Sequence, residues 1–447
     1  MERGGNSRKF PKQAGETKDR WSWVERSVWT ERMLERLEQS QEQTVWFSLW
    51  DKVWNGDNLS QAIFKVIENH GAAGIDGQTT EQLKQNWGSE RERLEKELRC
   101  GEYKPQPARR VWIPKAGTNE KRPLGIAAIR DRVVQAALKH VLEPIFEREF
   151  AAQSYGFRPG RGCLDALQRV EELLEAGNTW VVDIDLKSYF DTIPHDRLMV
   201  IIRKRVADGK VNELIEKYLQ AGVMEIGKGW QATEEGTPQG SVISPLLSNI
   251  YLNPLDHIMV AKGYEMVRYA DDMVICCRNE AQAQNALAET ATWAAGVGLK
   301  LHPIKTRIVN AAEKGGFDFL GYHFECYQNN DGRKWPRQKS QTKLREQLRE
   351  VLKRGRSGSI RKIVAEINPK LKGWYQYFRY SLPSALRRTD EWVRERIRNI
   401  IRRRHKRRGM VRGREHAEYP IAWFEAQGLF SLKDAQAQWL QSQTGNH

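Results

Sequence analysis

The sequence predicts an α+β fold in which mixed helices and strands are followed by an all-helical basic segment. Three observations support this prediction. Residues 180–186 alternate apolar and polar side chains, which is typical of a half-buried strand. Residues 112–126 and 266–277 each hold two β-prone runs around a turn, which predicts two hairpins. Beyond residue 331, apolar residues recur at helical spacing.

The order of the expected elements follows from the same patterns. The tryptophan-rich stripe at 46–54 predicts a helix that ends at Asn55-Gly56. The remaining elements are expected, in chain order, as a helix at 59–69, the first hairpin, a helix at 129–142, the strand at 180–186, helices up to about residue 219, the second hairpin, a strand pair at 315–324, and helices at 343–354, 360–367, 371–380 and 391–404.

Length and composition exclude several classes of protein. The chain has 447 residues, 40% hydrophobic and 29% charged, which indicates a globular protein of two to four domains. No run of about 18 apolar residues is present, so no membrane span is expected. Residues 1–20 are basic and polar, unlike a secretory signal, and are expected to be flexible. The five cysteines lack the spacing of a disulfide scaffold or zinc site, which predicts a cytoplasmic location.

The positive charge is concentrated in one part of the chain. The formal net charge is +16, and residues 331–414 alone hold 28 Lys and Arg against 7 Asp and Glu. Trp374 and other aromatic residues lie among these cations, and the densest run includes Arg402, Arg403 and Arg404. Cations interleaved with flat side chains suit a phosphate backbone and stacked bases, so this segment is predicted to bind nucleic acid. A solvated helical surface is the alternative.

Two groups of aspartates form the candidate catalytic site. Asp183 and Asp185 lie on one face of the predicted strand, and Asp271 and Asp272 lie at the tip of the second hairpin. If the strand and the hairpin lie side by side, Asp185, Asp271 and Asp272 can hold two magnesium ions about 3.5–4 Å apart, the arrangement used for phosphoryl transfer. Asp183 is expected to be a solvated residue of the groove. Adjacent aspartates in a turn also occur for structural reasons, which leaves both interpretations open.

Five blocks of the sequence resemble the palm blocks of reverse transcriptases and stand in that family's order. They are VDIDLKSYFD at 182–191, GTPQGSVISPLLSNI at 236–250, YADD at 269–272, LKLHPIKT at 299–306 and FLG at 319–321. Further blocks are similar to one branch, the bacterial group II intron-encoded proteins: 121–126 and 154–161 resemble their fingers, and GWYQYF at 373–378 resembles their maturase domain. The resemblance extends from about residue 59 to residue 432.

The resemblance implies a right-hand polymerase whose fingers and antiparallel palm sheet are followed by an all-helical thumb. The domains are then expected as an N-terminal extension at 1–58, fingers at 59–178, a palm with the YADD site at 179–330, a thumb or maturase domain at 331–400, and a basic DNA-binding segment at 401–447. Many relatives end in an endonuclease domain with Cys and His ligands. No Cys follows Cys326, so that domain is expected to be absent, and priming on an existing DNA 3′ end is expected instead.

The resemblance also implies the roles of the reacting groups. Asp185 and Asp271 would be the main magnesium ligands, with Asp272 assisting and the backbone carbonyl of Leu186 adding an oxygen. Lys305 would protonate the pyrophosphate leaving group as a general acid. An ordinary surface lysine is the alternative for Lys305.

Residues around the incoming nucleotide are expected on the first hairpin and on the palm. Lys115 and Arg122 would hold the triphosphate, with contact to the template backbone as the alternative. Phe190 would pack under the sugar and exclude a 2′-hydroxyl, with ordinary palm core as the alternative. Gln239 is expected on a turn beside the nucleotide.

The template is expected to meet three other residues. Arg158 and Arg161 would bind its phosphates, and Gly240 would let it approach the turn closely because glycine has no side chain.

The function predicted from this resemblance is RNA-directed DNA synthesis combined with maturase activity. The protein would bind a group II intron RNA, assist its splicing, and copy RNA into DNA during intron mobility, using a DNA target and primer, deoxynucleoside triphosphates and two Mg²⁺ ions. Three alternatives remain open. They are a host-encoded relative that acts in repair or phage defence, a maturase that binds RNA without polymerising, and an RNA-dependent RNA polymerase, against which Phe190 argues.

Overall fold

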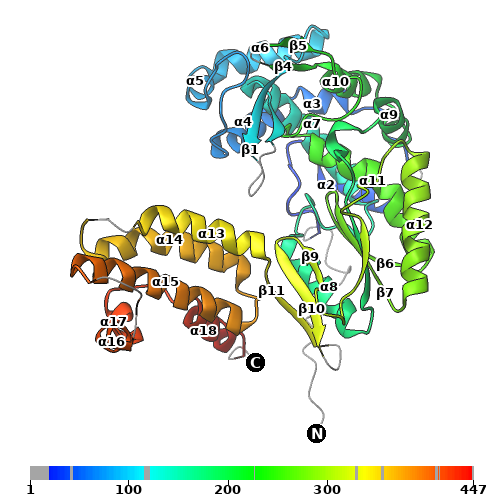
Figure 1. Ribbon diagram of the computed structural model, residues 1–447. Coiled ribbons are helices and arrows are strands. Elements are labelled where there is room, and N and C mark those ends of the chain that lie inside the picture. The colour runs from blue at the N-terminus through cyan, green and yellow to red at the C-terminus, as the bar shows by residue number, and fades with distance from the viewer. Residues whose placement is uncertain are drawn as a thin grey trace. The chain divides into compact units, whose positions relative to one another are not determined.

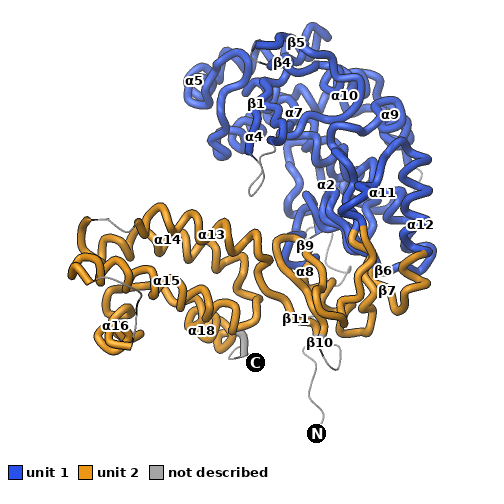
Figure 2. The backbone as a smooth tube through the Cα atoms, viewed as in Figure 1, with its two compact units in different colours: residues 1–166, 184–275, 285–306 blue, residues 167–183, 276–284, 307–447 orange. Residues whose placement is uncertain are grey.

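The computed structural model describes residues 20–40, 44–114, 121–225, 227–327, 331–353, 357–407, 411 and 413–444. Residues 1–19 of the predicted flexible segment, Lys115 and the turn of the first hairpin lie outside these residues. The chain divides into two compact units, which Figure 2 colours separately: unit 1 comprises residues 1–166, 184–275 and 285–306, and unit 2 comprises residues 167–183, 276–284 and 307–447. None of the helices in the described ranges is long and apolar enough to cross a membrane.

Unit 1 combines helices and strands, as predicted (Figure 1). Its helices are α2 (Glu31–Gln39), α3 (Trp50–Val53), α4 (Gly56–Glu68), α5 (Thr80–Gln85), α6 (Trp87–Cys100), α7 (Ile129–Glu147), α9 (His195–Arg203), α10 (Gly209–Gln220), α11 (Ser244–Ala261) and most of α12 (Glu280–Gly296). Its strands are β1 (Ala108–Pro114), β2 (Lys121–Ile126), β4 (Val223–Glu225), β5 (Gly229–Gln231), β6 (Glu265–Tyr269) and most of β7 (Asp272–Cys277).

The first predicted hairpin is confirmed and forms part of a four-stranded sheet with the order β2-β1-β4-β5. Strands β1 and β2 are antiparallel, with Arg110 opposite Gly125, whereas β4 runs parallel to β1. The backbone N–H of Gly125 donates to the carbonyl of Gln239 at 2.7 Å. This hydrogen bond ties the hairpin to the loop that precedes α11.

The tryptophan-rich stripe forms less helix than predicted. Helix α3 covers only Trp50–Val53, and Trp46 forms an isolated parallel bridge with Val206. The backbone N–H of Trp46 donates to Arg205, and its carbonyl accepts from Ala207, so this segment is extended. Apolar spacing over one or two turns does not distinguish a helix from an extended segment that packs on one face.

His140 is a buried polar group that joins α7 to the N-terminal part of the chain. Its Nδ1 lies 2.8 Å from Asn58 Oδ1, Lys65 Nζ donates to its Nε2 at 3.0 Å, and its carbonyl accepts from the indole of the buried Trp29. Burial and then the charges of Lys65 and Lys139 lower the pKa of His140 to about 3. The ring is therefore neutral in the folded protein at all ordinary pH values.

Acidification is expected to destabilise unit 1 through His140. The unfolded ring titrates with a pKa of about 6.5, so above that pH the residue has no effect, and below it only the unfolded state gains a proton. The free energy of unfolding should fall by about 2 kcal/mol from this residue between pH 7 and pH 5. Urea unfolding of wild type and His140→Gln at both pH values measures the effect. An equal loss in the two proteins would contradict the assignment.

Unit 2 begins with α8 (Cys163–Glu175), most of which it contains, and strand β3 (Trp180–Ile184), which pairs antiparallel with β8 (Arg307–Asn310). A three-stranded sheet follows, in which β10 (Tyr322–Tyr327) lies between β9 (Phe317–Phe319) and β11 (Asp331–Pro336). The predicted strand pair at 315–324 is thus extended by a third strand. The helices that follow are α13 (Gln338–Val351), α14 (Ile360–Phe378), α15 (Pro383–Arg404), α16 (Gly413–Glu418), α17 (Ile421–Ala426) and α18 (Leu432–Thr444).

The helical part of unit 2 has one continuous core. Helix α14 continues through Pro369 where two helices were predicted. The core residues on α13 to α15 include Leu348, Ile363 and Ile397, and Phe424 and Leu432 pack into the same cluster. The segment after residue 400 therefore shares its hydrophobic core with the preceding helices.

Candidate active site

The main chain around Asp185 is held by residues 300–306. His302 N donates to the Asp185 carbonyl at 2.7 Å, and Thr306 Oγ1 contacts both the N–H and the carbonyl of Asp185 at 3.3 Å. One residue on, Leu186 forms an antiparallel bridge with Leu301, and its side chain is buried. Two blocks that are far apart in the sequence thus form one rigid platform, from which the Asp185 carboxylate projects.

Lys305 lies on this platform and contacts the Asp185 carboxylate directly. Its Nζ lies 3.0 Å from Asp185 Oδ2, and the two side chains are 59% and 30% exposed. The turn that carries Lys305 is fixed by His302, whose Nδ1 accepts from the backbone N–H groups of Ile304 and Lys305. The ammonium group is therefore placed beside the reacting groups, and its proposed general-acid role remains a prediction.

The second predicted hairpin is confirmed, with Asp271 in the turn between β6 and β7. Ala270, the residue before it, has a φ of +58°, in the left-handed region that non-glycine residues seldom adopt. A Cβ at Gly156 would lie 2.3 Å from Ala270 N, so glycine is required where that segment passes the turn. The turn is thus strained and closely packed, which is typical of a functional position.

A fully buried arginine supports this strained turn. Arg268 donates to the Ala270 carbonyl and to Asn249 Oδ1, both at 2.9 Å, and to Ser154 Oγ at 2.8 Å. Its Nε lies 2.7 Å from Asp256 Oδ1, and neither side chain of this ion pair is exposed. Arg268 therefore joins the turn to α11 and to the segment around Ser154.

The carboxylates of Asp271 and Asp185 act on each other. Burial raises the pKa of Asp271, and the neighbouring Asp185 carboxylate raises it further, whereas Arg268 and Lys305 lower it. Asp272 is exposed on the same turn. Two hard carboxylates that repel each other fit a divalent cation that takes its other ligands from water and phosphate. Within the described ranges, no group of three or more His, Cys, Asp or Glu side chains forms a complete protein-made metal site.

Asp183, which was expected to be a solvated residue of the groove, has a different cation beside it from that of Asp185. It lies opposite Arg307 in the β3–β8 pairing, and Arg307 Nε lies 3.4 Å from Asp183 Oδ2. This ion pair gives Asp183 a structural partner within unit 2.

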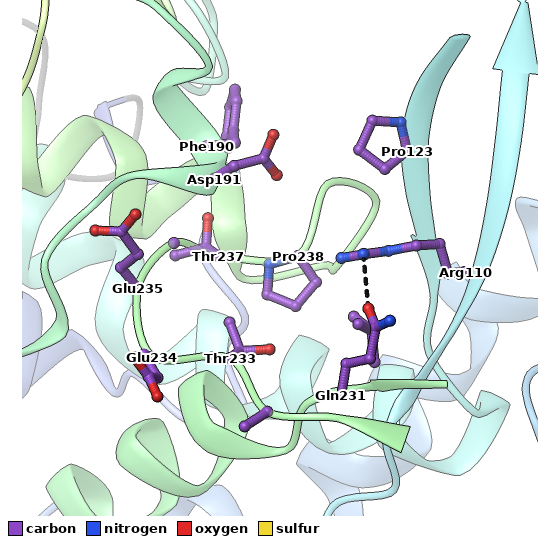
Figure 3. A pocket seen from close by; sticks show the side chains of 13 residues that line it. Arg110, Pro123, Phe190, Asp191, Gln231, Thr233, Glu234, Glu235, Thr237 and Pro238 are labelled. Carbon is purple, nitrogen blue, oxygen red and sulfur yellow. Dashed lines mark hydrogen bonds between the residues drawn. The ribbon is translucent and has the colours of Figure 1, made fainter. Parts of the chain in front are cut away.

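Phe190 lines a cavity of about 420 Å³ in unit 1 (Figure 3). Phe190 and Asp191 form one wall, Arg110 and Pro123 project from strands β1 and β2 on another, and the loop from Gln231 to Pro238 closes the rest. Arg110 Nη1 donates to Gln231 Oε1 at 3.3 Å, shown as the dashed line in Figure 3. The cavity is large enough for a small molecule of nucleotide size, at the low end of the range of about 300–1,000 Å³ for ligand pockets.

The turn with Gln239 and Gly240 lies against the first hairpin. Gly240 has a φ of +103°, and a Cβ there would lie 2.7 Å from the Gly125 carbonyl. Glycine at 240 is therefore required by the approach of the β2 backbone, a reason different from the template contact predicted for it. Arg122, on β2, is exposed and stays a candidate for the triphosphate.

The structure gives Arg158 protein partners, and the template contact predicted for it stays a prediction. Its side chain is 3% exposed and forms an ion pair with Glu147, and its Nη1 donates to the carbonyls of Ala151 and Ser154. With these partners Arg158 fixes the loop after α7. Arg161 is half-buried and donates to the Ala152 carbonyl.

The arginines predicted to bind nucleic acid separate into two kinds. Arg402 is 12% exposed and lies 3.3 Å from the buried Glu415, so it joins α15 to α16. Arg403 and Arg404 are exposed. Trp374 is half-buried and packs on Phe378 with ring centroids 4.6 Å apart, which indicates a packing role for most of its surface.

Sequence analysis missed Arg110 and Arg268. Arg110 lies in the basic hairpin beside the residues that were chosen, and no spacing in the sequence distinguishes it. Arg268 offered a usable signal, since a charged residue inside an apolar strand has to find buried partners.

Comparisons with known proteins agree with the resemblance predicted from the sequence. Residues 113–324 match the family described as reverse transcriptase (RNA-dependent DNA polymerase), and residues 341–418 match the group II intron, maturase-specific domain. Protein YkfC of Escherichia coli (strain K12) is 36% identical over 305 residues, which cover 59% of this chain and 79% of that protein. Group II intron-encoded protein LtrA of Lactococcus lactis subsp. cremoris is 36% identical over 243 residues, or 52% of this chain and 39% of that protein.

Among solved structures, the similarity is weak. A chain of a partial Cas6-RT-Cas1–Cas2 complex matches with a TM-score of 0.35 and 21% sequence identity, covering 56% of this chain and 42% of that chain. A similarity at this level does not bear on the geometry of the site.

Proposed function

This chain belongs to the reverse transcriptase family of group II intron-encoded proteins, and we propose that it is an RNA-directed DNA polymerase with a maturase region. The two matching segments, 113–324 and 341–418, stand in the order that such a protein requires. We also assign it a right-hand polymerase fold, with fingers around β1 and β2, a palm around Asp185 and Asp271, and a thumb from α13 onward. The mixed helices and strands of unit 1 and the helical core of unit 2 support this assignment.

The electrostatic cluster of Asp185, Asp271 and Lys305 is the observation that carries the proposal. The three residues come from separate sequence blocks, and the Asp271 carboxylate responds to both of the others. A strained turn and a platform of backbone hydrogen bonds hold them in place. Fixed charges around a developing phosphoryl charge are what phosphoryl transfer requires of a protein.

Each residue of the cluster has a different role in nucleotide addition. Asp185 and Asp271, assisted by Asp272, would hold two magnesium ions, which supply charge neutralisation at the reacting phosphate and a lower pKa for the attacking hydroxyl. The primer 3′-hydroxyl gives up its proton to solvent, its oxygen forms the new bond to the α-phosphorus, and the bond to the pyrophosphate oxygen breaks. Lys305 holds a proton at Nζ, 3.0 Å from Asp185, and delivers it to the leaving pyrophosphate.

The cavity beside Phe190 is assigned to the incoming nucleotide. Phe190 is half-buried at its wall and packs edge-on against Tyr189, whose hydroxyl donates to the Ser248 carbonyl. This support fixes the ring, so a 2′-hydroxyl would clash with it. Arg110 and Arg122 would face the phosphates from the first hairpin.

Replacing Phe190 by alanine is expected to admit ribonucleotides. Discrimination against a ribonucleoside triphosphate should fall roughly tenfold to hundredfold, because the steric filter is lost while the hydroxyl finds water as a partner. Single-nucleotide incorporation with each sugar measures the ratio of kcat/KM values. Phe64→Ala, an exposed phenylalanine on α4, serves as the control. Unchanged discrimination between the two sugars in Phe190→Ala would mean that Phe190 has only an ordinary packing role.

The helical region is assigned to RNA binding and to support of the primer. Leu320 and Gly321, in the block that resembles a primer grip, both have positive φ. The hydroxyl of Tyr377 on α14 donates to the Leu320 carbonyl at 2.6 Å, and that of Tyr322 donates to the Tyr377 carbonyl at 2.6 Å. The turn that would hold the primer end is thus bonded to the maturase region, which would bind the group II intron RNA and assist splicing.

Primer extension tests the proposed activity. A DNA primer annealed to an RNA template is incubated with the full chain, magnesium and either deoxynucleotides or ribonucleotides. Extension with deoxynucleotides that chelation of magnesium abolishes is the expected result. No extension, combined with tight binding of a structured intron RNA, would contradict the polymerase assignment and leave a maturase.

A further inference from the structure

One tryptophan on the helical part of unit 2 is surrounded by three arginines. The guanidinium carbons of Arg345, Arg349 and Arg396 lie 5.7, 6.0 and 5.3 Å from the centroid of the Trp392 ring. Two of them come from α13 and the third comes from α15, the helix of Trp392 itself. The indole is half-buried against the core of unit 2, so its outer surface serves as a platform for cations.

The periodicity of α15 extends this platform along one face of the helix. With 3.6 residues per turn, Arg388, Arg396 and Arg403 project within about 40° of Trp392. Arg388 and Arg403 are exposed, and the distance between them along the helix is about 22 Å at 1.5 Å per residue. We call Trp392 with Arg345, Arg349, Arg388, Arg396 and Arg403 the arginine stripe.

The arginines next in sequence lie elsewhere on the helix. Arg387 and Arg404 project about 140° and 120° away from Trp392. Arg387 lies 3.6 Å from Glu391, and Arg402 pairs with Glu415. The basic run at 402–404 therefore does not act as one unit, since only Arg403 shares the face of Trp392.

Guanidiniums held over an aromatic ring are well suited to bind phosphates. The ring attracts the cation and restricts its conformation before a ligand arrives, while its N–H groups stay available to an anion. Several such groups close together repel one another unless an anion lies over them. A row of this length matches an extended polyanion better than a single phosphate.

We propose that the arginine stripe is the surface on which this protein holds the sugar-phosphate backbone of an RNA. The proposal deepens the RNA-binding role assigned to the maturase region and rests on that assignment. Trp392 orients the guanidiniums of Arg345, Arg349 and Arg396, which lie over its ring. Recognition through the backbone makes the stripe indifferent to base sequence.

A matched pair of double variants tests the stripe. Arg388→Gln/Arg403→Gln removes two stripe arginines, and Arg387→Gln/Arg404→Gln removes their exposed neighbours from the same helix, so both proteins lose the same charge. Binding of a 20-nucleotide oligo(U) and of an RNA duplex of equal length is measured from 50 to 300 mM salt. The first probe represents an unpaired template and the second a folded intron.

The stripe variant is expected to bind at least one probe about tenfold more weakly, with a salt slope reduced by about 1.5–2, whereas the neighbour variant should change less than twofold. The probe that responds identifies the source of the RNA. Equal weakening in both variants would mean a diffuse positive field and overturn the proposal.

Trp392→Phe should retain more affinity for RNA than Trp392→Leu, and equal retention would contradict the platform role of Trp392. Primer extension by wild type, run in parallel, separates failure of the stripe from failure of the polymerase assignment.

Discussion

Replacing Asp271 by asparagine is expected to reduce DNA synthesis by about a thousandfold or more. The amide has the shape of the carboxylate but no charge, so the cluster with Asp185 and Lys305 loses half of its negative charge. A loss of about 4 kcal/mol of transition-state stabilisation corresponds to this factor. Primer extension under single-turnover conditions measures the rate. Folding should be preserved or improved, because burial already disfavours the charged form of Asp271.

Asp183→Asn is the matched control for this variant. It removes a carboxylate two residues from Asp185 that pairs with Arg307 at 3.4 Å on a partly exposed edge. Such ion pairs contribute about 0–1 kcal/mol, so activity should stay within a few-fold of wild type. RNA binding by both variants should match wild type. Equal loss of synthesis in the two variants would show that negative charge in this region, and not Asp271 itself, is what matters.

The sequence was sufficient to predict the carboxylates and their order. Alternation along 180–186 separates Asp183 and Asp185 from the buried face, and the turn at 270–271 is short enough to recognise from adjacent polar residues. The structure adds that Asp183 and Asp185 differ in their partners, Arg307 and Lys305. That difference depends on which residue of the 302–307 segment lies opposite each aspartate. The pattern of apolar and polar residues within each segment does not reveal how two distant segments pair.

Positive charge in the sequence predicted the exposed nucleic-acid-binding residues less well than the carboxylate motifs predicted the candidate catalytic site. Arg158 was predicted to bind the template from the family resemblance, and Arg402 to bind nucleic acid from the basic run around it, yet each is paired with a glutamate of a neighbouring helix, Glu147 of α7 and Glu415 of α16. Burial of such a pair is decided by tertiary packing, which the residue type does not report. Conversely, Arg388 joins the face of Trp392 and Arg403 only because α15 is one helix from Pro383 to Arg404, whereas the predicted helix began at 391.

The turn that carries Asp271 depends on the fully buried Arg268. Ala270 has a left-handed backbone, and its carbonyl is held by Arg268 at 2.9 Å. The same guanidinium reaches Asn249 and Ser154 and is neutralised by Asp256. Arg268 is therefore a positioning residue, whose loss should affect both folding and the placement of Asp271.

Arg268→Met is expected to lower the free energy of unfolding by about 3–5 kcal/mol, because it leaves the Asp256 carboxylate buried without its partner. The double variant Arg268→Met/Asp256→Leu removes both charges, and much of the stability should return. The Ala270 carbonyl still lacks its donor in that protein, so DNA synthesis should remain about tenfold to hundredfold below wild type. Denaturant unfolding and primer extension, performed on the same preparations, separate the two effects. If DNA synthesis recovers together with stability in the double variant, Arg268 has only a structural role. If stability recovers and DNA synthesis does not, the contact between Arg268 and the turn sets the position of Asp271.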